Sequence, residues 1–112
     1  MRLATVVIAA ALFAATLALE ANAKGNPANG KTKAAQVCAA CHGPDGNKPV
    51  APENPVLAGQ HFDYLVKTLS DYKSGKRNNA IMKGFAAQLS KQDIEDLSAW
   101  FASQPSALRS SR

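Results

Sequence analysis

The stretch Cys38-Ala39-Ala40-Cys41-His42 contains both cysteines of the chain and one of its two histidines. Two thiols three positions apart, presented by one helical turn, can reach the two vinyl groups on one edge of a porphyrin and bond to them. The next side chain, His42, then lies beneath the ring, where an imidazole nitrogen can bind the iron. A Cys-x-x-Cys-His run is therefore typical of covalent haem attachment.

Three other uses of the cysteine pair fit the sequence less well. A thioredoxin-like redox pair belongs beside alternating strands and helices, and the chain has no convincing strand pattern. A zinc site needs four ligands, and His61 is the only further histidine. A disulfide between Cys38 and Cys41 would close a very short loop, would stabilise little and would leave His42 unexplained.

Residues 1–23 have the pattern of an export signal. Met1-Arg2 is a short positive start, Leu3 to Leu19 is almost wholly apolar, and Ala21-Asn22-Ala23 matches an A-x-A cleavage site. An uncleaved membrane anchor is the alternative, but the apolar run is shorter than the roughly 20 residues that a spanning helix needs. We therefore expect a cleaved signal peptide over residues 1–23, one domain over residues 24–112, and a periplasmic location.

Charge and core size narrow the class of protein further. The net charge is +5 at pH 7, which favours partners with acidic surfaces. An exported chain without interleaved aromatic and basic residues is not expected to bind nucleic acid. Large apolar side chains are few for a domain of this size, so we expect the chain without haem to be unfolded or molten.

Capping and turn residues predict three helices. The first covers about residues 30–41, with Asn29 as its N-cap. The second covers about residues 60–73 and ends at Gly75. The last opens with the capping-box-like Ser90-Lys91-Gln92-Asp93 and stops at Gln104-Pro105. Residues 43–55 read as a loop, and residues 75–88 as a less regular stretch.

Apolar residues recur at spacings of three and four on the second and last helices, which predicts one buried stripe on each. The stripe on the second helix consists of Phe62, Leu65, Val66, Leu69 and Tyr72. The stripe on the last helix consists of Ile94, Leu97, Trp100 and Phe101. In a haem protein the core and the wall of the cofactor site can be the same surface.

Met82 is the only methionine of the chain besides Met1. A lone methionine usually fills a gap in a core, but a thioether is also a common axial ligand of haem iron. We therefore predict Met82 as the second axial ligand. His61, at the start of the second predicted helix, is the less favoured alternative.

With these residues in hand, the chain resembles a class I c-type cytochrome of the bacterial cytochrome c553 and single-domain cytochrome c4-like group. The resemblance covers most of residues 29–104. The matching pieces, in chain order, are Gly30, Cys38-Ala39-Ala40-Cys41-His42-Gly43, Pro55-Val56-Leu57-Ala58-Gly59-Gln60, Tyr64-Leu65, Tyr72-Lys73-Ser74-Gly75-Lys76-Arg77, Met82, and the helix from Leu89-Ser90 to Trp100.

The resemblance implies an all-α fold, with three to five helices packed around one covalently bound haem. It implies thioether bonds from Cys38 and Cys41, and axial iron ligation by His42 and Met82. Pro55 matches a proline whose carbonyl accepts the proximal imidazole N–H. Gly30 matches a glycine that lets the first and last helices cross closely, here against Trp100.

Iron with both axial positions filled has no site for a substrate, so we expect a soluble electron carrier and not an enzyme, with no catalytic residues. Two alternatives stay open: a haem subunit of a larger oxidoreductase, and a five-coordinate gas-binding haem protein. We expect a monomer whose partners are redox proteins with acidic docking surfaces, membrane-bound oxidoreductase complexes among them. Basic residues that could steer them are Lys48, Lys67, Lys73, Lys76, Arg77 and Lys83.

Overall fold

The computed structural model describes residues 24–106, and these residues form helices and no strands. In chain order the helices are α2 (Pro27–Val37), α3 (Ala39–His42), α4 (Phe62–Ser74), α5 (Ala80–Ala87) and α6 (Lys91–Ser103). The predicted all-α fold is confirmed. The predicted signal peptide lies outside the described residues, and no helix within them is long and apolar enough to cross a membrane.

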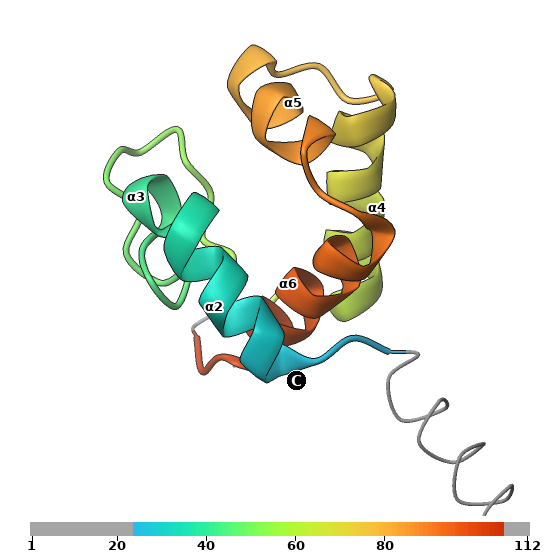
Figure 1. Cartoon of the computed structure of the whole chain (residues 1–112). Coiled ribbons are helices and arrows are strands. Elements are labelled where there is room, and N and C mark those ends of the chain that lie inside the picture. Colours follow the sequence, from blue (N-terminus) through green and yellow to red (C-terminus); the bar gives the residue numbers. More distant parts are fainter. Residues whose placement is uncertain (1–23, 107–112) are drawn as a thin grey trace, which may run out of the picture.

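Helix α6 packs against both α2 and α4, while α3 extends from α2 and α5 packs on α4. Figure 1 shows the consequence: α3 and α5 stand on opposite sides of an opening, and α6 joins the two arms at its base. The core lies where α2, α4 and α6 meet, and its buried members are Ala34, Leu65, Leu89, Ile94, Leu97 and Phe101.

The crossing of α2 and α6 depends on Gly30. A Cβ atom at this position would lie 1.9 Å from the carbonyl oxygen of Asp96 and 2.8 Å from Cβ of Trp100. Both distances are shorter than any van der Waals contact, so only glycine allows the two helix backbones to approach this closely. The predicted close crossing against Trp100 is confirmed.

The first helix differs from its prediction at both ends. It begins at Pro27, and Asn26 is the N-cap, because the Asn26 side chain accepts hydrogen bonds from the N–H groups of Ala28 and Asn29. The predicted cap, Asn29, lies inside the helix. The helix starts earlier because Pro27 suits the first helical position, where its missing N–H costs no hydrogen bond. At Cys38 the helix breaks, and the short α3 follows.

The other helix ends follow the sequence more closely. Helix α4 ends at Gly75, whose φ of 86° is left-handed, as predicted. Helix α6 begins with a capping box in which the side chains of Ser90 and Asp93 each accept the other's backbone N–H, also as predicted. It ends before Gln104.

The stretch expected to be irregular contains helix α5, which is a correction. Asn79 is its N-cap, and the Asn79 side chain accepts the N–H of Met82 at 3.0 Å. Gly84 lies inside the helix, with open space where a Cβ would be. The packing of α5 on α4 supplies stability that a short glycine-containing segment lacks by itself.

The loop between α3 and α4 is tied to α6. The N–H of Gly59 donates to the carbonyl of Phe101 at 2.9 Å, and Trp100 Nε1 donates to the carbonyl of Pro44 at 3.3 Å. The N–H of Leu57 donates to the carbonyl of Gly46 at 2.9 Å, which closes the loop on itself. The loop is therefore held in place beside His42, although it contains no helix or strand.

Candidate functional site

A cavity of about 560 Å³ lies between the two arms of the fold. Its volume is in the range of small-molecule and cofactor sites. All four residues predicted to bind the haem line it: Cys38, Cys41, His42 and Met82. Three of them come from α3 and its N-cap and one from α5, so the tertiary structure brings together residues that are up to 44 positions apart in the sequence.

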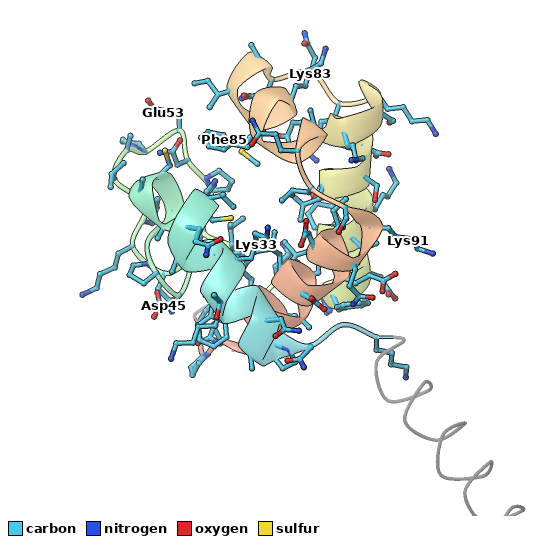
Figure 2. The ribbon with its side chains drawn as sticks, in the orientation of Figure 1. Lys33, Asp45, Glu53, Lys83, Phe85 and Lys91 are labelled. Atoms are coloured by element: carbon cyan, nitrogen blue, oxygen red, sulfur yellow. The ribbon has the colours of Figure 1, made fainter. Side chains whose placement is uncertain are left out.

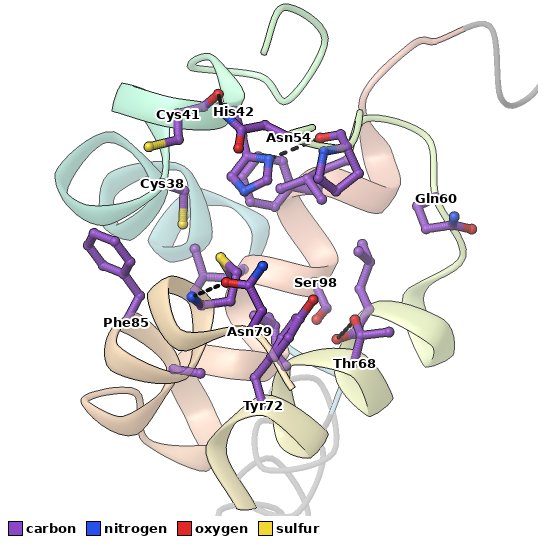
Figure 3. A pocket seen from close by; sticks show the side chains of 18 of the residues that line it. Cys38, Cys41, His42, Asn54, Gln60, Thr68, Tyr72, Asn79, Phe85 and Ser98 are labelled. Atoms are coloured by element: carbon purple, nitrogen blue, oxygen red, sulfur yellow. Dashed lines mark hydrogen bonds between the residues drawn. The ribbon is translucent and has the colours of Figure 1, made fainter. Parts of the chain in front are cut away.

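The two cysteines are presented by the junction of α2 and α3. Both thiols are free, and Figure 3 shows Cys38 and Cys41 on the same side of the cavity. The backbone that carries them is fixed, because the carbonyl of Cys41 accepts the N–H of Val50 at 3.0 Å and the side-chain amide of Asn54 at 3.2 Å. Burial raises the pKa of the Cys38 thiol to about 11, since the charged thiolate would lose its hydration.

His42 is buried, with 6% of its surface exposed. Its Nδ1 lies 2.9 Å from the carbonyl oxygen of Pro55 (Figure 3). A carbonyl can only accept a hydrogen bond, so Nδ1 carries the proton and Nε2 keeps its lone pair. In the neutral form of this ring, Nε2 is therefore the nitrogen that can bind a metal, and the predicted contact with Pro55 is confirmed.

Met82 lies in the first turn of α5 and lines the same cavity. Its side chain is half-buried, and its backbone N–H donates a hydrogen bond to the side chain of Asn79. His61, the alternative axial ligand, is the N-cap residue of α4. It is exposed and is not among the residues that line the cavity.

Comparison with known proteins places this arrangement in a family. The family model for cytochrome c matches residues 27–105. The chain belongs to the cytochrome c family. Cytochrome c4 of Pseudomonas aeruginosa is 54% identical over 84 residues, which are 75% of this chain and 41% of that protein. The chain thus spans about two fifths of the length of this relative.

A second relative and a solved structure agree with this assignment. The thiosulfate dehydrogenase electron acceptor of Stutzerimonas stutzeri is 40% identical over 76 residues, 68% of this chain and 35% of that protein. The crystal structure of reduced cytochrome c4 from Pseudomonas stutzeri matches with a TM-score of 0.67 and 44% identity, over 72% of this chain and 46% of that chain. The predicted c4-like group is confirmed.

The cofactor of a cytochrome c is covalently bound haem c, and the walls of the cavity fit a porphyrin. Apolar side chains from four helices and the loop between α3 and α4 form most of the lining, among them Val37, Leu57, Leu65, Leu69, Phe85, Leu97 and Phe101. Three of these are buried members of the core cluster and three more pack against it, so core and cavity wall are one surface. A flat apolar ring would bury this surface.

Several polar residues also line the cavity, and the sequence reasoning missed most of them: Asn54, Tyr64, Thr68, Asn79 and Ser98. A signal was available for α4, because Tyr64, Thr68 and Tyr72 recur at four-residue spacing and so share one face of the helix.

Of the six basic residues expected to steer partners, only Arg77 lines the cavity. Figure 2 shows Lys83 pointing outward, on another side of α5 from Phe85.

Proposed function

We propose that the chain is a periplasmic one-electron carrier, with its haem attached to Cys38 and Cys41 and its iron ligated by His42 and Met82. The observation that supports this best is the tautomer of His42. The Pro55 carbonyl accepts the proton of Nδ1, so Nε2 is the nitrogen that a neutral His42 offers to a metal, and His42 lines a cavity that the only methionine of residues 24–106 also lines.

Haem bound in this cavity would supply a one-electron Fe(III)/Fe(II) couple. The chain's own residues would do the rest. Pro55 would increase the basicity of His42 by accepting its N–H. A thioether from Met82 would fill the remaining axial position, so neither oxygen nor substrate could bind. The apolar walls would exclude water, which keeps the reorganisation that accompanies electron transfer small. We therefore propose that the chain has no catalytic activity of its own.

An optical spectrum tests the proposed ligands. Protein from a host that attaches haem should keep its pigment after acid-acetone extraction, and the oxidised form should show the weak near-infrared band of iron bound to a thioether. Met82→Ala should lose this band and should bind carbon monoxide when reduced. The matched control is His61→Ala, which should keep the band. An unchanged spectrum in Met82→Ala would refute the assignment and would favour a gas-binding haem protein.

We also propose that the partners are redox proteins with acidic docking surfaces. The net charge of +5 supports this, and so does the relative whose name is thiosulfate dehydrogenase electron acceptor. Electron exchange with an acidic redox protein should slow as salt is added, because salt screens the attraction. A rate that does not depend on salt would contradict the proposal. Gel filtration of a native extract separates a free carrier from a subunit of a larger complex.

Periplasmic location rests on the predicted signal over residues 1–23. Fractionation of a host that expresses the full chain should yield the pigment in the periplasm, with Lys24 as the first residue of the mature protein. Pigmented protein that stays in the membrane fraction and begins at Met1 would favour the uncleaved anchor.

A further inference from the structure

Lys73, in the last turn of α4, binds the end of a second helix. Its Nζ donates to the carbonyl oxygen of Ala87, the last residue of α5, at 3.4 Å, and also to the carbonyl oxygen of Leu89. Leu89 is buried and directly precedes Ser90, the N-cap of α6. One ammonium group therefore joins α4 to the connection between α5 and α6, which Figure 1 shows running past α4.

The carbonyl groups that Lys73 binds lie at the C-terminal end of α5. The last C=O groups of a helix have no partner within the helix, and they form the negative end of its dipole. Here the carbonyl of Ala86 accepts the N–H of Leu89 at 3.1 Å, whereas the carbonyl of Ala87 accepts from Lys73. A lysine at this position stabilises the helix both as a donor and as a positive charge.

The ammonium of Lys73 takes part in no ion pair within residues 24–106, where the two pairs are Lys33 with Asp93 and Lys67 with Asp71. Backbone carbonyls are its acceptors instead. Lys73 does not line the cavity either. Although the sequence analysis counted it among the residues that could steer partners, its contacts are with α5 and the start of α6.

A single side chain holds each end of α5. The Asn79 side chain accepts the N–H of Met82 at 3.0 Å at the N-terminal end, and Lys73 binds the carbonyl of Ala87 at the C-terminal end. The helix has eight residues, which is about two turns. A helix this short moves as one body, so a bond at its C-terminal end also restrains Met82 in its first turn.

We propose that Lys73 is a positioning residue that holds α5 in place and thereby sets how often Met82 leaves the iron. This rests on the proposed function, in which Met82 is the second axial ligand. Hydrogen bonds with a charged donor are stronger than those between neutral groups, and α5 has to break this one before it can move away from α4. Loss of the bond therefore raises the population of the state in which that axial position is vacant.

Carbon monoxide binding to the reduced holoprotein at neutral pH, without any partner, measures this vacant state. Lys73→Ala should speed binding about three- to tenfold. The matched control is Lys67→Ala, which removes the same charge from the same helix, but whose ammonium pairs with Asp71 within α4. It should change the rate by less than about twofold. Equal rates in the two variants would overturn the proposal, because the contact with α5 would then have no effect of its own.

Two further variants test how Lys73 acts. Lys73→Arg keeps the charge and the N–H donors, so it should stay within about twofold of wild type; a rate equal to that of Lys73→Ala would count against the proposed bond. In Met82→Ala no thioether has to leave the iron, so adding Lys73→Ala should change the rate by less than about twofold. A further three- to tenfold rise there would overturn the proposal, because Lys73 would then control access to the cavity and not Met82.

Guanidinium unfolding of the same samples separates a local role from a general one. Lys73→Ala and Lys67→Ala should unfold at similar denaturant concentrations, since each loses one contact of an exposed lysine. Carbon monoxide rates that simply follow overall stability would overturn the role of Lys73.

The near-infrared band of wild type decides the proposed function separately. If wild type lacks this band, Met82 is not the ligand, and the proposed function fails whatever Lys73 does. If wild type has the band and Lys73→Ala binds carbon monoxide at the wild-type rate, only the role of Lys73 is refuted.

Discussion

The two arms of the molecule hold their predicted iron ligands in different ways. His42 is 6% exposed, and its ring is fixed by the Pro55 carbonyl. The backbone beside it is fixed by two hydrogen bonds to the carbonyl of Cys41. Met82 is carried by α5, whose only fully buried residue is Ala86. Its two large apolar side chains, Ile81 and Phe85, line the cavity and do not belong to the core cluster.

Helix α5 packs chiefly on one other helix, α4. Its N-terminus is capped by Asn79, and at its other end Lys73 of α4 donates to the carbonyls of Ala87 and Leu89. A segment that packs on one neighbouring helix and is held by a few capping bonds is the kind that opens first. The histidine side should therefore be rigid, and the methionine side should open locally at low cost.

The largest effect should come from leaving out the haem. Residues 24–112 made in the cytoplasm, where haem is not attached, should show neither a cooperative melt nor a native near-UV dichroism spectrum. The reason is that the apolar walls of a cavity of about 560 Å³ would lack a partner. Holoprotein from a host that attaches haem is the control. A sharp melt of the haem-free chain would show that α2, α4 and α6 suffice for folding.

Glycines on the two arms should respond in opposite ways to alanine. Gly30→Ala should destabilise the holoprotein by about 3 kcal/mol, because the new Cβ meets the Asp96 carbonyl across the helix crossing. Gly84→Ala on α5 is the matched control, since open space surrounds it. It should be neutral or stabilising by up to about 1 kcal/mol. Guanidinium unfolding measures both, and a similar loss in both variants would remove the contrast.

Two asparagine caps allow the ligand to be tested apart from overall stability. Asn79→Ala and Asn26→Ala each remove an N-cap and should each cost about 1 kcal/mol of helix stability. Only Asn79 holds the turn that carries Met82. Asn79→Ala should therefore weaken the near-infrared band and speed carbon monoxide binding, while Asn26→Ala should leave both unchanged. If both variants bind carbon monoxide equally fast, dissociation of Met82 from the iron depends on the stability of the whole protein and not on the N-cap of α5.

The smallest effect concerns acid and the capping box of α6. The backbone N–H of Ser90 and the nearby Lys33 hold the pKa of Asp93 below its usual value. A carboxyl whose pKa is lower in the folded state stabilises the fold above the unfolded pKa of about 3.9, and that contribution disappears as the pH falls through the folded value. Asp93→Asn should therefore flatten the loss of stability below about pH 4. An acid limb identical to that of wild type would assign this loss to other carboxyls.

The sequence predicted those parts of the fold that local chemistry decides. The capping box of Ser90 and Asp93 and the left-handed Gly75 need only their own neighbours in the chain, and both are confirmed. Gly30 and Pro55 were predicted through the family resemblance, and the contacts to Trp100 and His42 bear this out. The ligand roles of Cys38, Cys41, His42 and Met82 stay predictions, although all four line one cavity.

The parts that the sequence reasoning missed depend on distant partners. Helix α5 looked irregular because a short segment with Gly84 has a weak helical pattern, and its packing on α4 cannot be seen in the pattern. Arg77 read as a surface charge because nothing in the chain order shows that it turns toward two tyrosines at the cavity. The break at Cys38 was missed as well, and the residue pattern of the predicted helix over residues 30–41 does not mark it.

The sequence by itself determined that the chain is helical and that a Cys-x-x-Cys-His element and one downstream methionine are available for haem, because motif spacing and capping are local properties. The packing of the helices decides that Nδ1 of His42 faces the Pro55 carbonyl, that Met82 and the two thiols line the same cavity, and that Arg77 lines it as well. These are distances between α3, α4 and α5, and such distances are set by how the helices pack around α6.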